Sequence, residues 1–301
     1  MLNNLIIKVL PIIPKPIVYI FAKKYIAGPN LSDAVKVTLD LMNKGGFSTI
    51  DVLGEFVTTK DKALYELSMI DKVLDAINEH KLKSYLSIKP TSLGMGIDFE
   101  FGYENIFQLV DKANKLGIFV RLDMENSPYT DNTLKMYKLF REKGYSNIGF
   151  VIQAYMKRSE NDVKSLLDYK PNIRLCKGIY NESPDIAYKD YNEIRKNYIK
   201  LLDLMLDNNL YVGIATHDEY LINYALKQIK DRDLKREEYE FQMLLGVREN
   251  RRDELLKEGH NLRVYVPFGV DWYGYSIRRL KENPQMAGHI FKSIFGIGRW
   301  N

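Results

Sequence analysis

Four residues near the end of this 301-residue chain have the types and spacing of an anion-binding site. They are Tyr275, Arg278, Arg279 and Glu282, and separations of three and four residues place such side chains on one face of a helix. Paired arginines can hold a carboxylate through parallel hydrogen bonds, and the tyrosine ring adds an apolar wall beside it. The same pattern is also typical of a solvated, salt-bridged surface helix, so this alternative stays open.

The elements that precede these residues set where the helix begins. An apolar run over 262–266 predicts a strand that stops at Pro267. Asp271 is suited to cap a helix that starts directly after it. We therefore expect the anion-binding face to follow a strand end.

Strand-like and helix-like segments alternate along the rest of the chain. Strands are expected at 48–53, 84–89, 117–123, 147–152, 172–176, 210–215, 238–244 and 262–266. Helices are expected at about 60–80, 101–116, 131–144, 159–168, 185–208, 218–230 and 246–259. Eight short apolar strands separated by amphipathic helices predict an α/β fold of the (βα)8 barrel class. An open doubly wound sheet is the alternative, but no strand is followed by a glycine-rich nucleotide-binding loop.

The chain contains no Pro/Gly/Ser-rich linker, which predicts a single domain. Its expected parts are an N-terminal helical segment over 1–45, a barrel over 46–283 and a tail over 284–301. Residues 1–22 are apolar, but charged and proline residues interrupt them, so we expect packed helix turns, with contact to a membrane surface as the alternative. The tail is expected either to close the active site or to contact lipid.

Composition excludes several classes of protein. Cys176 is the only cysteine, which rules out an intrachain disulfide and a cysteine-based zinc site and favours a reducing, cytoplasmic compartment. None of the four histidines has a second His or Cys at metal-binding spacing, so the sequence predicts no metal site. The net charge of +5 is spread along the chain, which fits an anionic ligand or a membrane surface better than nucleic acid.

Polar residues stand where the predicted strands end, which is the end of a barrel that carries the chemistry. In chain order they are Asp51, Glu55, Lys89, Asp123, Gln153, Tyr155, Arg174, Lys177, Tyr180, Thr216, His217, Gln242 and Tyr265, and Met124, Gly178 and Leu244 stand beside them. Lys89 and Asp123 are expected to lie on adjacent strands and to pair, because a buried lone charge is costly. The set offers cations and hydrogen-bonding groups without an evident nucleophile, which suits an enzyme whose chemistry belongs to an organic cofactor.

From about Ala22 to Asn283, the chain resembles the proline dehydrogenase family. The similarity extends to the monofunctional bacterial enzymes and to the corresponding domain of larger bifunctional bacterial proteins. It rests on eight motifs in the order of the predicted strands: Asp51–Glu55, Ser87–Gly94, Arg121–Glu125, Val151–Tyr155, Arg174–Tyr180, Ala215–His217, Glu240–Gly246 and Tyr265–Gly269. The helix with Tyr275, Arg278, Arg279 and Glu282 is the most specific part.

The resemblance implies a distorted (βα)8 TIM barrel with extra N-terminal helices that holds FAD at its mouth. The implied reaction is oxidation of L-proline to Δ1-pyrroline-5-carboxylate by hydride transfer to flavin N5, the first step of proline catabolism. Electrons would pass to a membrane quinone, which implies contact with the inner face of the cell membrane. The product would pass to a separate pyrroline-5-carboxylate dehydrogenase.

The resemblance also implies roles for individual residues. Arg278 and Arg279 would bind the substrate carboxylate with Lys89, which Asp123 would orient, while Glu282 would fix an arginine. The substrate ring would lie against Leu244, Tyr265 and Tyr275. The residues implied in catalysis are Lys89, Asp123 and Tyr180. The implied FAD contacts are Met124, Gln153, Arg174, Lys177, Gly178, Tyr180, Thr216 and His217, with Arg174 near flavin N5.

Three alternative functions remain open at this point. Oxidation of 4-hydroxyproline or another cyclic amine is the nearest, and the bulk of Tyr265 disfavours an added hydroxyl. A Schiff-base lyase or aldolase on the same fold would use Lys89 or Lys177. A non-enzymatic binder of anions or membranes would use the basic surface and the apolar N-terminal residues.

Overall fold

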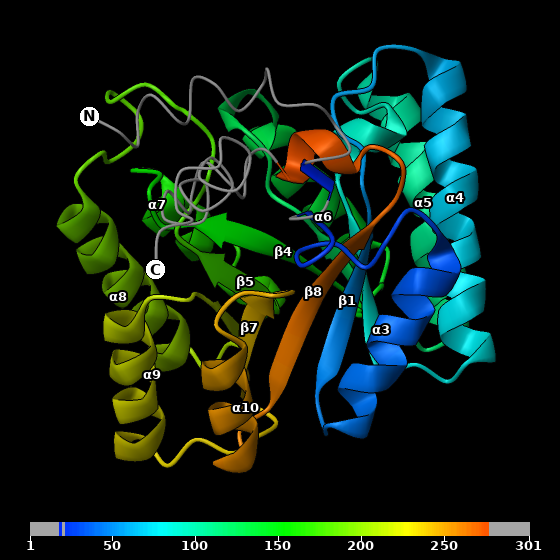
Figure 1. The fold of residues 1–301 in the computed structure, drawn as a ribbon. Helices are drawn as coiled ribbons and strands as arrows, with labels where there is room; N and C mark the ends of the chain where they lie inside the picture. Colours follow the sequence, from blue (N-terminus) through cyan, green and yellow to red (C-terminus); the bar gives the residue numbers. More distant parts are fainter. Residues whose placement is uncertain (1–17, 20–21, 277–301) are drawn as a thin grey trace, which may run out of the picture.

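Eight parallel strands close into a barrel in sequence order, with the last strand paired to the first (Figure 1). This computed structural model describes residues 18–19 and 22–276. The strands are β1 (Phe47–Val52), β2 (Ser84–Ile88), β3 (Val120–Leu122), β4 (Ile148–Gln153), β5 (Ile173–Cys176), β6 (Val212–Ala215), β7 (Tyr239–Leu244) and β8 (Leu262–Phe268). The predicted α/β barrel is therefore confirmed.

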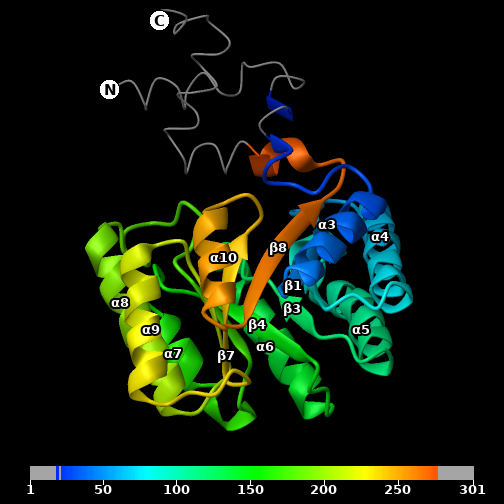
Figure 2. The same cartoon turned by 60° about the horizontal axis from the view of Figure 1, so that its bottom comes forward.

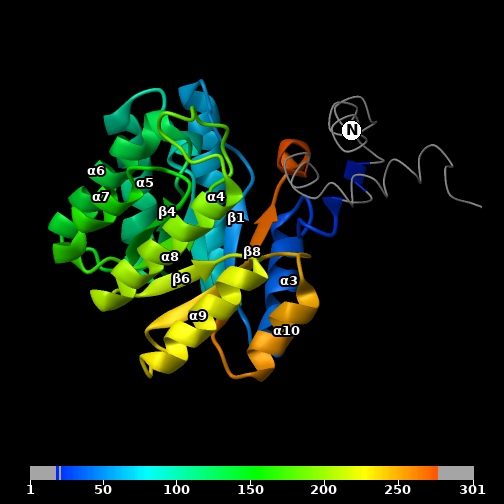
Figure 3. The ribbon, with the colours of Figure 1, turned by 90° about the vertical axis from the view of Figure 1, so that its left-hand side faces the viewer.

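Helices surround the barrel and follow the strands in turn. They are α3 (Leu31–Asn43), α4 (Lys60–Glu79), α5 (Phe99–Lys115), α6 (Thr130–Glu142), α7 (Ser159–Lys164), α8 (Tyr191–Asp207), α9 (Glu219–Asp231) and α10 (Glu249–Lys257), with short 3₁₀ turns η2 (Pro90–Leu93), η3 (Ser127–Tyr129) and η4 (Leu167–Tyr169). Helices α4 and α5 lie on one side of the barrel, and α8 and α9 lie on the opposite side (Figure 2). Helices α3 and α10 both pack on β8 (Figure 3).

The strands bury both faces, but the two faces differ in chemistry. Residues such as Leu86, Val120 and Ile148, which lie in register on neighbouring strands, are fully buried and apolar. The alternate positions include Arg121, in register with Gly149, and carry many polar side chains. Because successive strand residues point to opposite faces, the apolar set packs under the helices while the polar set lies inside the barrel. The barrel interior thus holds a hydrogen-bonded network that ends at the mouth.

Strand β8 runs beyond the predicted stop at Pro267, which was wrong as a strand terminator. Pro267 lies opposite Asp51 of β1, and the strand ends at Phe268. Proline lacks the amide hydrogen but keeps its carbonyl, which accepts a hydrogen bond from the backbone N–H of Ala27 at 2.9 Å. Helical residues then begin at Trp272, directly after Asp271.

Two predicted helices are shorter than expected. The helix expected at 185–208 begins only at Tyr191, because the side chain of Asp190 accepts hydrogen bonds from the backbone of Asn192 and Glu193 and so caps it. The helix expected at 159–168 ends at Lys164 and is followed by η4. The other helix predictions agree with the structure within a few residues.

Some of the predictions concern residues that the structure does not describe. They include the packing of residues 1–17 and 20–21, the role of the tail over 284–301, and Arg278, Arg279 and Glu282. The division into 1–45, 46–283 and 284–301 stays a prediction. Within the described part of the chain, no helix combines the length and apolar character that crossing a membrane requires.

Candidate active site

A cavity of about 660 Å³ opens at the carboxyl ends of the barrel strands. All the predicted site residues that the structure describes line it, namely Lys89, Asp123, Met124, Gln153, Arg174, Lys177, Gly178, Tyr180, Thr216, His217, Leu244, Tyr265 and Tyr275. They come from seven different strand ends and from the segment after β8, so the closed barrel is what brings them together. Convergent polar groups in a large cavity are the usual form of an enzyme site.

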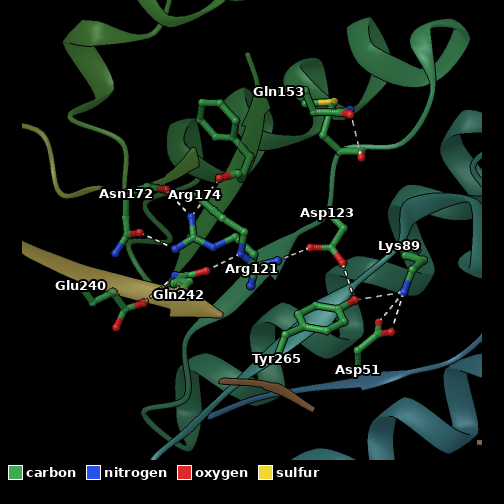
Figure 4. Close-up of polar contacts among 12 residues, drawn as sticks. Asp51, Lys89, Arg121, Asp123, Gln153, Asn172, Arg174, Glu240, Gln242 and Tyr265 are labelled. Carbon is green, nitrogen blue, oxygen red and sulfur yellow. Dashed lines mark hydrogen bonds and ion pairs between the residues drawn. The ribbon is translucent and has the colours of Figure 1, made fainter. Parts of the chain in front are cut away.

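Lys89, which follows β2, pairs with Asp51 rather than with Asp123, so the predicted Lys89–Asp123 pair was wrong. The Lys89 Nζ lies 2.6 Å from both carboxylate oxygens of Asp51 (Figure 4). Asp51 lies opposite Ser87 on the neighbouring strand, two residues before Lys89, so its carboxylate is within reach. The carboxylate of Asp123 is instead occupied by partners from β5 and β8.

The Lys89–Asp51 pair is buried, with side-chain exposures of 10% and 1%. Burial alone would lower the pKa of Lys89, but Asp51 and Asp123 outweigh burial and raise that pKa above its usual value. Burial raises the pKa of Asp51 to about 6, even though Lys89 opposes the shift. At neutral pH both groups are therefore charged, and the cavity keeps a lysine ammonium at its wall.

Asp123 joins Arg174 and Tyr265 at the cavity wall. Its Oδ1 lies 2.7 Å from Arg174 Nη1, and its Oδ2 accepts a hydrogen bond from the Tyr265 hydroxyl at 2.9 Å (Figure 4). The Tyr265 oxygen also accepts from Lys89 Nζ at 3.3 Å. Burial, followed by Asp123 and Asp51, raises the Tyr265 pKa well above its usual value, so the phenol keeps its proton and donates a hydrogen bond to Asp123. Tyr265 and Lys89 together thus connect the Asp123 carboxylate to that of Asp51.

The cavity wall near β5 and β6 contains a cation and a glycine that the path of the backbone requires. Lys177 Nζ lies 3.2 Å from Asp218 Oδ2. Gly178 has φ +102°, and a Cβ there would lie 2.1 Å from the Tyr155 ring, so the position requires glycine. Both features fix the path of the chain where β5 leaves the barrel.

His217 has a defined protonation pattern. Its Nε2 accepts a hydrogen bond from the backbone N–H of Leu244 at 2.9 Å, so this nitrogen carries no proton. The side-chain amide of Gln153 donates to the backbone oxygens of Met124 and Glu125 at 3.2 and 2.9 Å. The Gln153 contacts tie the end of β4 to the end of β3, and the His217 contact ties the end of β6 to the end of β7.

Two residues with clear positions in the site had no predicted role. Asp51 is 1% exposed and holds Lys89, and Gln242 is 6% exposed and accepts a hydrogen bond from Arg174 Nε at 2.6 Å. Both stand among the polar residues at the predicted strand ends. The signal that could have assigned them is strand alternation, since each falls on the polar, interior face.

The cavity has the chemistry to hold a large, planar, anionic cofactor. Arg174 and Lys177 supply cations, while Gln153 and Thr216 supply neutral hydrogen-bonding groups beside the apolar side chains of the same wall. This donor set and the cavity volume fit a flavin nucleotide. Among residues 18–19 and 22–276, no cluster of three or more His, Cys, Asp or Glu side chains is arranged to hold a metal ion.

Comparisons with known proteins point to one family. The family model described as "Proline dehydrogenase" matches residues 34–291. "Proline dehydrogenase 2" of Bacillus subtilis (strain 168) is 37% identical over 273 residues, which cover 91% of this chain and 90% of that protein. "Proline dehydrogenase" of Deinococcus radiodurans is 34% identical over 277 residues, with 91% and 89% covered.

The solved structures support the fold. Proline utilization A (PutA) from Bdellovibrio bacteriovorus, inactivated by N-propargylglycine, superimposes with a TM-score of 0.81 at 24% identity. The match covers 87% of this chain and 32% of that one, so the present chain corresponds to about a third of the larger protein. At this level of identity the similarity concerns the barrel architecture.

Proposed function

Since the chain belongs to the proline dehydrogenase family, we propose that it oxidises L-proline to Δ1-pyrroline-5-carboxylate with FAD as the hydride acceptor. The observation that supports this most is that all the predicted substrate and cofactor residues within the described part of the chain line one cavity. Reaction at this site would be the first step of proline catabolism.

The substrate carboxylate is proposed to bind to Lys89 together with Arg278 and Arg279, with Glu282 fixing an arginine. Support for the lysine comes from its buried pairing with Asp51, which keeps the ammonium charged and fixes its direction. A charged donor held in place loses little conformational entropy when a carboxylate arrives. Arg278, Arg279 and Glu282 enter this proposal through the family resemblance.

The pyrrolidine ring is proposed to lie against Tyr265, Leu244 and Tyr275. Tyr265 cannot turn freely, because its hydroxyl is bonded to Asp123 and Lys89. A fixed aromatic wall holds the reacting carbon in one orientation, and orientation is the larger part of catalysis when two bound reactants exchange a hydride. Tyr180 and Asp123 complete the set proposed to act in catalysis.

FAD is proposed to bind along the wall formed by Met124, Gln153, Arg174, Lys177, Gly178, Tyr180, Thr216 and His217. When bound, it supplies the acceptor for the hydride and its electron pair. Arg174 would place positive charge next to the redox-active ring system, and Asp123 holds the guanidinium there. Gly178 would let the chain turn at this wall, because the absence of a side chain leaves room for the Tyr155 ring behind it.

We propose that the electrons pass to a membrane quinone at the inner face of the cell membrane. The product is proposed to pass to a separate pyrroline-5-carboxylate dehydrogenase. Both proposals rest on the family resemblance. They predict that a quinone analogue, rather than NAD, supports turnover with L-proline.

Product formation tests the proposed function. Purified protein loaded with FAD is incubated with L-proline and a soluble quinone analogue, and pyrroline-5-carboxylate is trapped as its coloured adduct with o-aminobenzaldehyde. The wild-type protein should form product, and Lys89→Met should need a much higher proline concentration because one carboxylate contact is lost. If the FAD-loaded wild-type protein forms no adduct, the proposed reaction is wrong.

A further inference from the structure

The guanidinium of Arg174 is held from two directions by side chains of other strands. Its Nη1 lies 2.7 Å from Asp123 Oδ1, and its Nε donates to Gln242 Oε1 at 2.6 Å (Figure 4). Arg174 and Gln242 are 7% and 6% exposed, and both line the cavity. With two of its nitrogens engaged, the plane of the guanidinium is set by these two partners together.

Glu240 fixes which way the Gln242 amide faces. Gln242 Nε2 donates to Glu240 Oε1 at 2.6 Å, and the same oxygen accepts from Arg263 Nε at 2.8 Å. Burial would raise the pKa of Glu240, but Arg263 and the amide outweigh it and lower this pKa, so the group is ionised. A turned amide would place its NH₂ against the Arg174 N–H and its oxygen against a carboxylate. The amide oxygen must therefore face Arg174.

Gly213 provides the space that this contact needs. Strand β6 separates β5 from β7, and Gly213 lies in register between Arg174 and Glu240. A Cβ on Gly213 would lie 2.4 Å from Gln242 Nε2 and 2.9 Å from its Cδ. The Gln242 amide thus crosses the interior face of β6 at the one residue there that has no side chain. Steric space is the reason for glycine here, since its φ lies outside the left-handed region.

We propose that Gln242 is a positioning residue for the reaction, which fixes the Arg174 guanidinium at the cavity wall. Glu240 orients its amide, and Gly213 leaves the space for it. Gln242 adds a second contact to Arg174 without adding charge, whereas Asp123 holds the same guanidinium with a full carboxylate. The inference rests on the proposed function, because it gives Arg174 its place beside the cofactor.

Two variants break this contact in different ways. Gln242→Leu removes the amide, and Gly213→Ala displaces it without removing any polar side chain. Gln228→Leu is the matched control, because Gln228 Oε1 accepts a similar bond from Arg232 Nε at 3.1 Å on the partly exposed face of α9. If Gln242→Leu does not fold, as judged by circular dichroism, Gly213→Ala still tests the proposal.

The first readout needs no cofactor. Hydrogen exchange at the Arg174 Nε–H is followed by ¹⁵N NMR, with the signal assigned from its absence in Arg174→Lys. Exchange should become at least about tenfold faster in Gln242→Leu and in Gly213→Ala and stay unchanged in Gln228→Leu. Only the first two variants lose a buried hydrogen bond of a charged group. Unchanged exchange in a folded Gln242→Leu protein would overturn the proposal.

The second readout concerns the bound flavin and separates positioning from a structural role. In both variants the ratio of oxidised to reduced flavin at a given potential should rise about tenfold. This corresponds to a flavin reduction potential that is about 30 mV lower for a two-electron couple. The kcat should fall while the KM for proline stays within about twofold, because Lys89 is untouched. A lower melting temperature with unchanged potential and kcat would show a structural role and overturn the proposal. If FAD binds to the wild-type protein but proline does not reduce it, the proposed function fails. Hydrogen exchange at Arg174 Nε–H and the flavin reduction potential would then still test whether Gln242 positions Arg174.

Discussion

Replacement of Asp51 by Asn should be one of the most damaging isosteric changes at this site. The substitution keeps the size of the side chain and one oxygen acceptor but removes the negative charge that faces Lys89. Both oxygens of Asp51 lie 2.6 Å from Lys89 Nζ, and the two side chains are 1% and 10% exposed. The ammonium would be left buried without its nearest counter-charge.

The magnitude follows from the burial of the pair. Breaking a buried ion pair by removing one partner costs about 3–5 kcal/mol, because the remaining charge stays desolvated. The matched control is Asp111→Asn, which breaks a Lys115–Asp111 pair of similar length, 2.7 Å, with side chains 72% and 32% exposed. An exposed pair contributes little, because water screens both charges. The two variants should therefore differ by several kcal/mol although the chemical change is the same.

The pH dependence of substrate binding gives a second consequence. Asp51 and Asp123 raise the pKa of Lys89, so the ammonium persists in the wild-type protein above the usual lysine range. Without Asp51, burial lowers this pKa, and the cation is lost as the pH rises through the new value. The KM for proline in Asp51→Asn, relative to wild type, should therefore increase between about pH 7 and about pH 9.

Urea unfolding followed by circular dichroism at neutral pH measures the first effect, and steady-state kinetics measure the second. The reasoning would be refuted by an Asp51→Asn protein whose unfolding free energy lies within about 1 kcal/mol of wild type. A KM ratio that does not change with pH would refute the proposed electrostatic role of Asp51 separately.

Three further predictions follow from other parts of the site. Arg278→Met should raise the KM for proline strongly while FAD stays bound, and unchanged proline affinity would remove this residue from the carboxylate site. Burial raises the pKa of Glu125 to about 7, above its unfolded value, so its contribution to stability is present at low pH and lost as the pH rises towards 7. Relative to wild type, Glu125→Gln should therefore gain about 2.5 kcal/mol of unfolding free energy between pH 5 and pH 8, and an equal difference in urea midpoint between the two proteins at both pH values would contradict this. Gly178→Ala should destabilise the protein by at least about 1–3 kcal/mol and weaken FAD binding, because its Cβ would meet the Tyr155 ring at a positive φ; a fluorescence titration with wild-type affinity would count against the assignment.

Much of the fold was predictable because the buried strands of a parallel barrel appear in the sequence as short apolar runs. The run over 147–152, for example, became β4 with every residue buried. Pro267 misled the prediction, because a missing amide hydrogen was taken as the end of the strand when the carbonyl still had a partner in Ala27. The late start of α8 depends on the Asp190 cap, which apolar spacing does not reveal.

The site was predictable as a set of residues but less so as a set of contacts. Strand order placed Lys89 between β1 and β3, and either neighbour could supply its carboxylate. The register of β1 against β2 brings Asp51 within reach of Lys89, and no local sequence pattern encodes the register between two strands that a helix separates. The Arg174–Gln242 contact was harder still, because it crosses β6 and depends on the absence of a side chain at Gly213.

The most direct test of the central claim is the visible absorption spectrum of the purified, FAD-loaded protein before and after anaerobic addition of L-proline. The account predicts the bands of oxidised flavin, bleached by L-proline and poorly by trans-4-hydroxy-L-proline. A protein that takes up no FAD, or one whose bound flavin L-proline leaves oxidised, would contradict it.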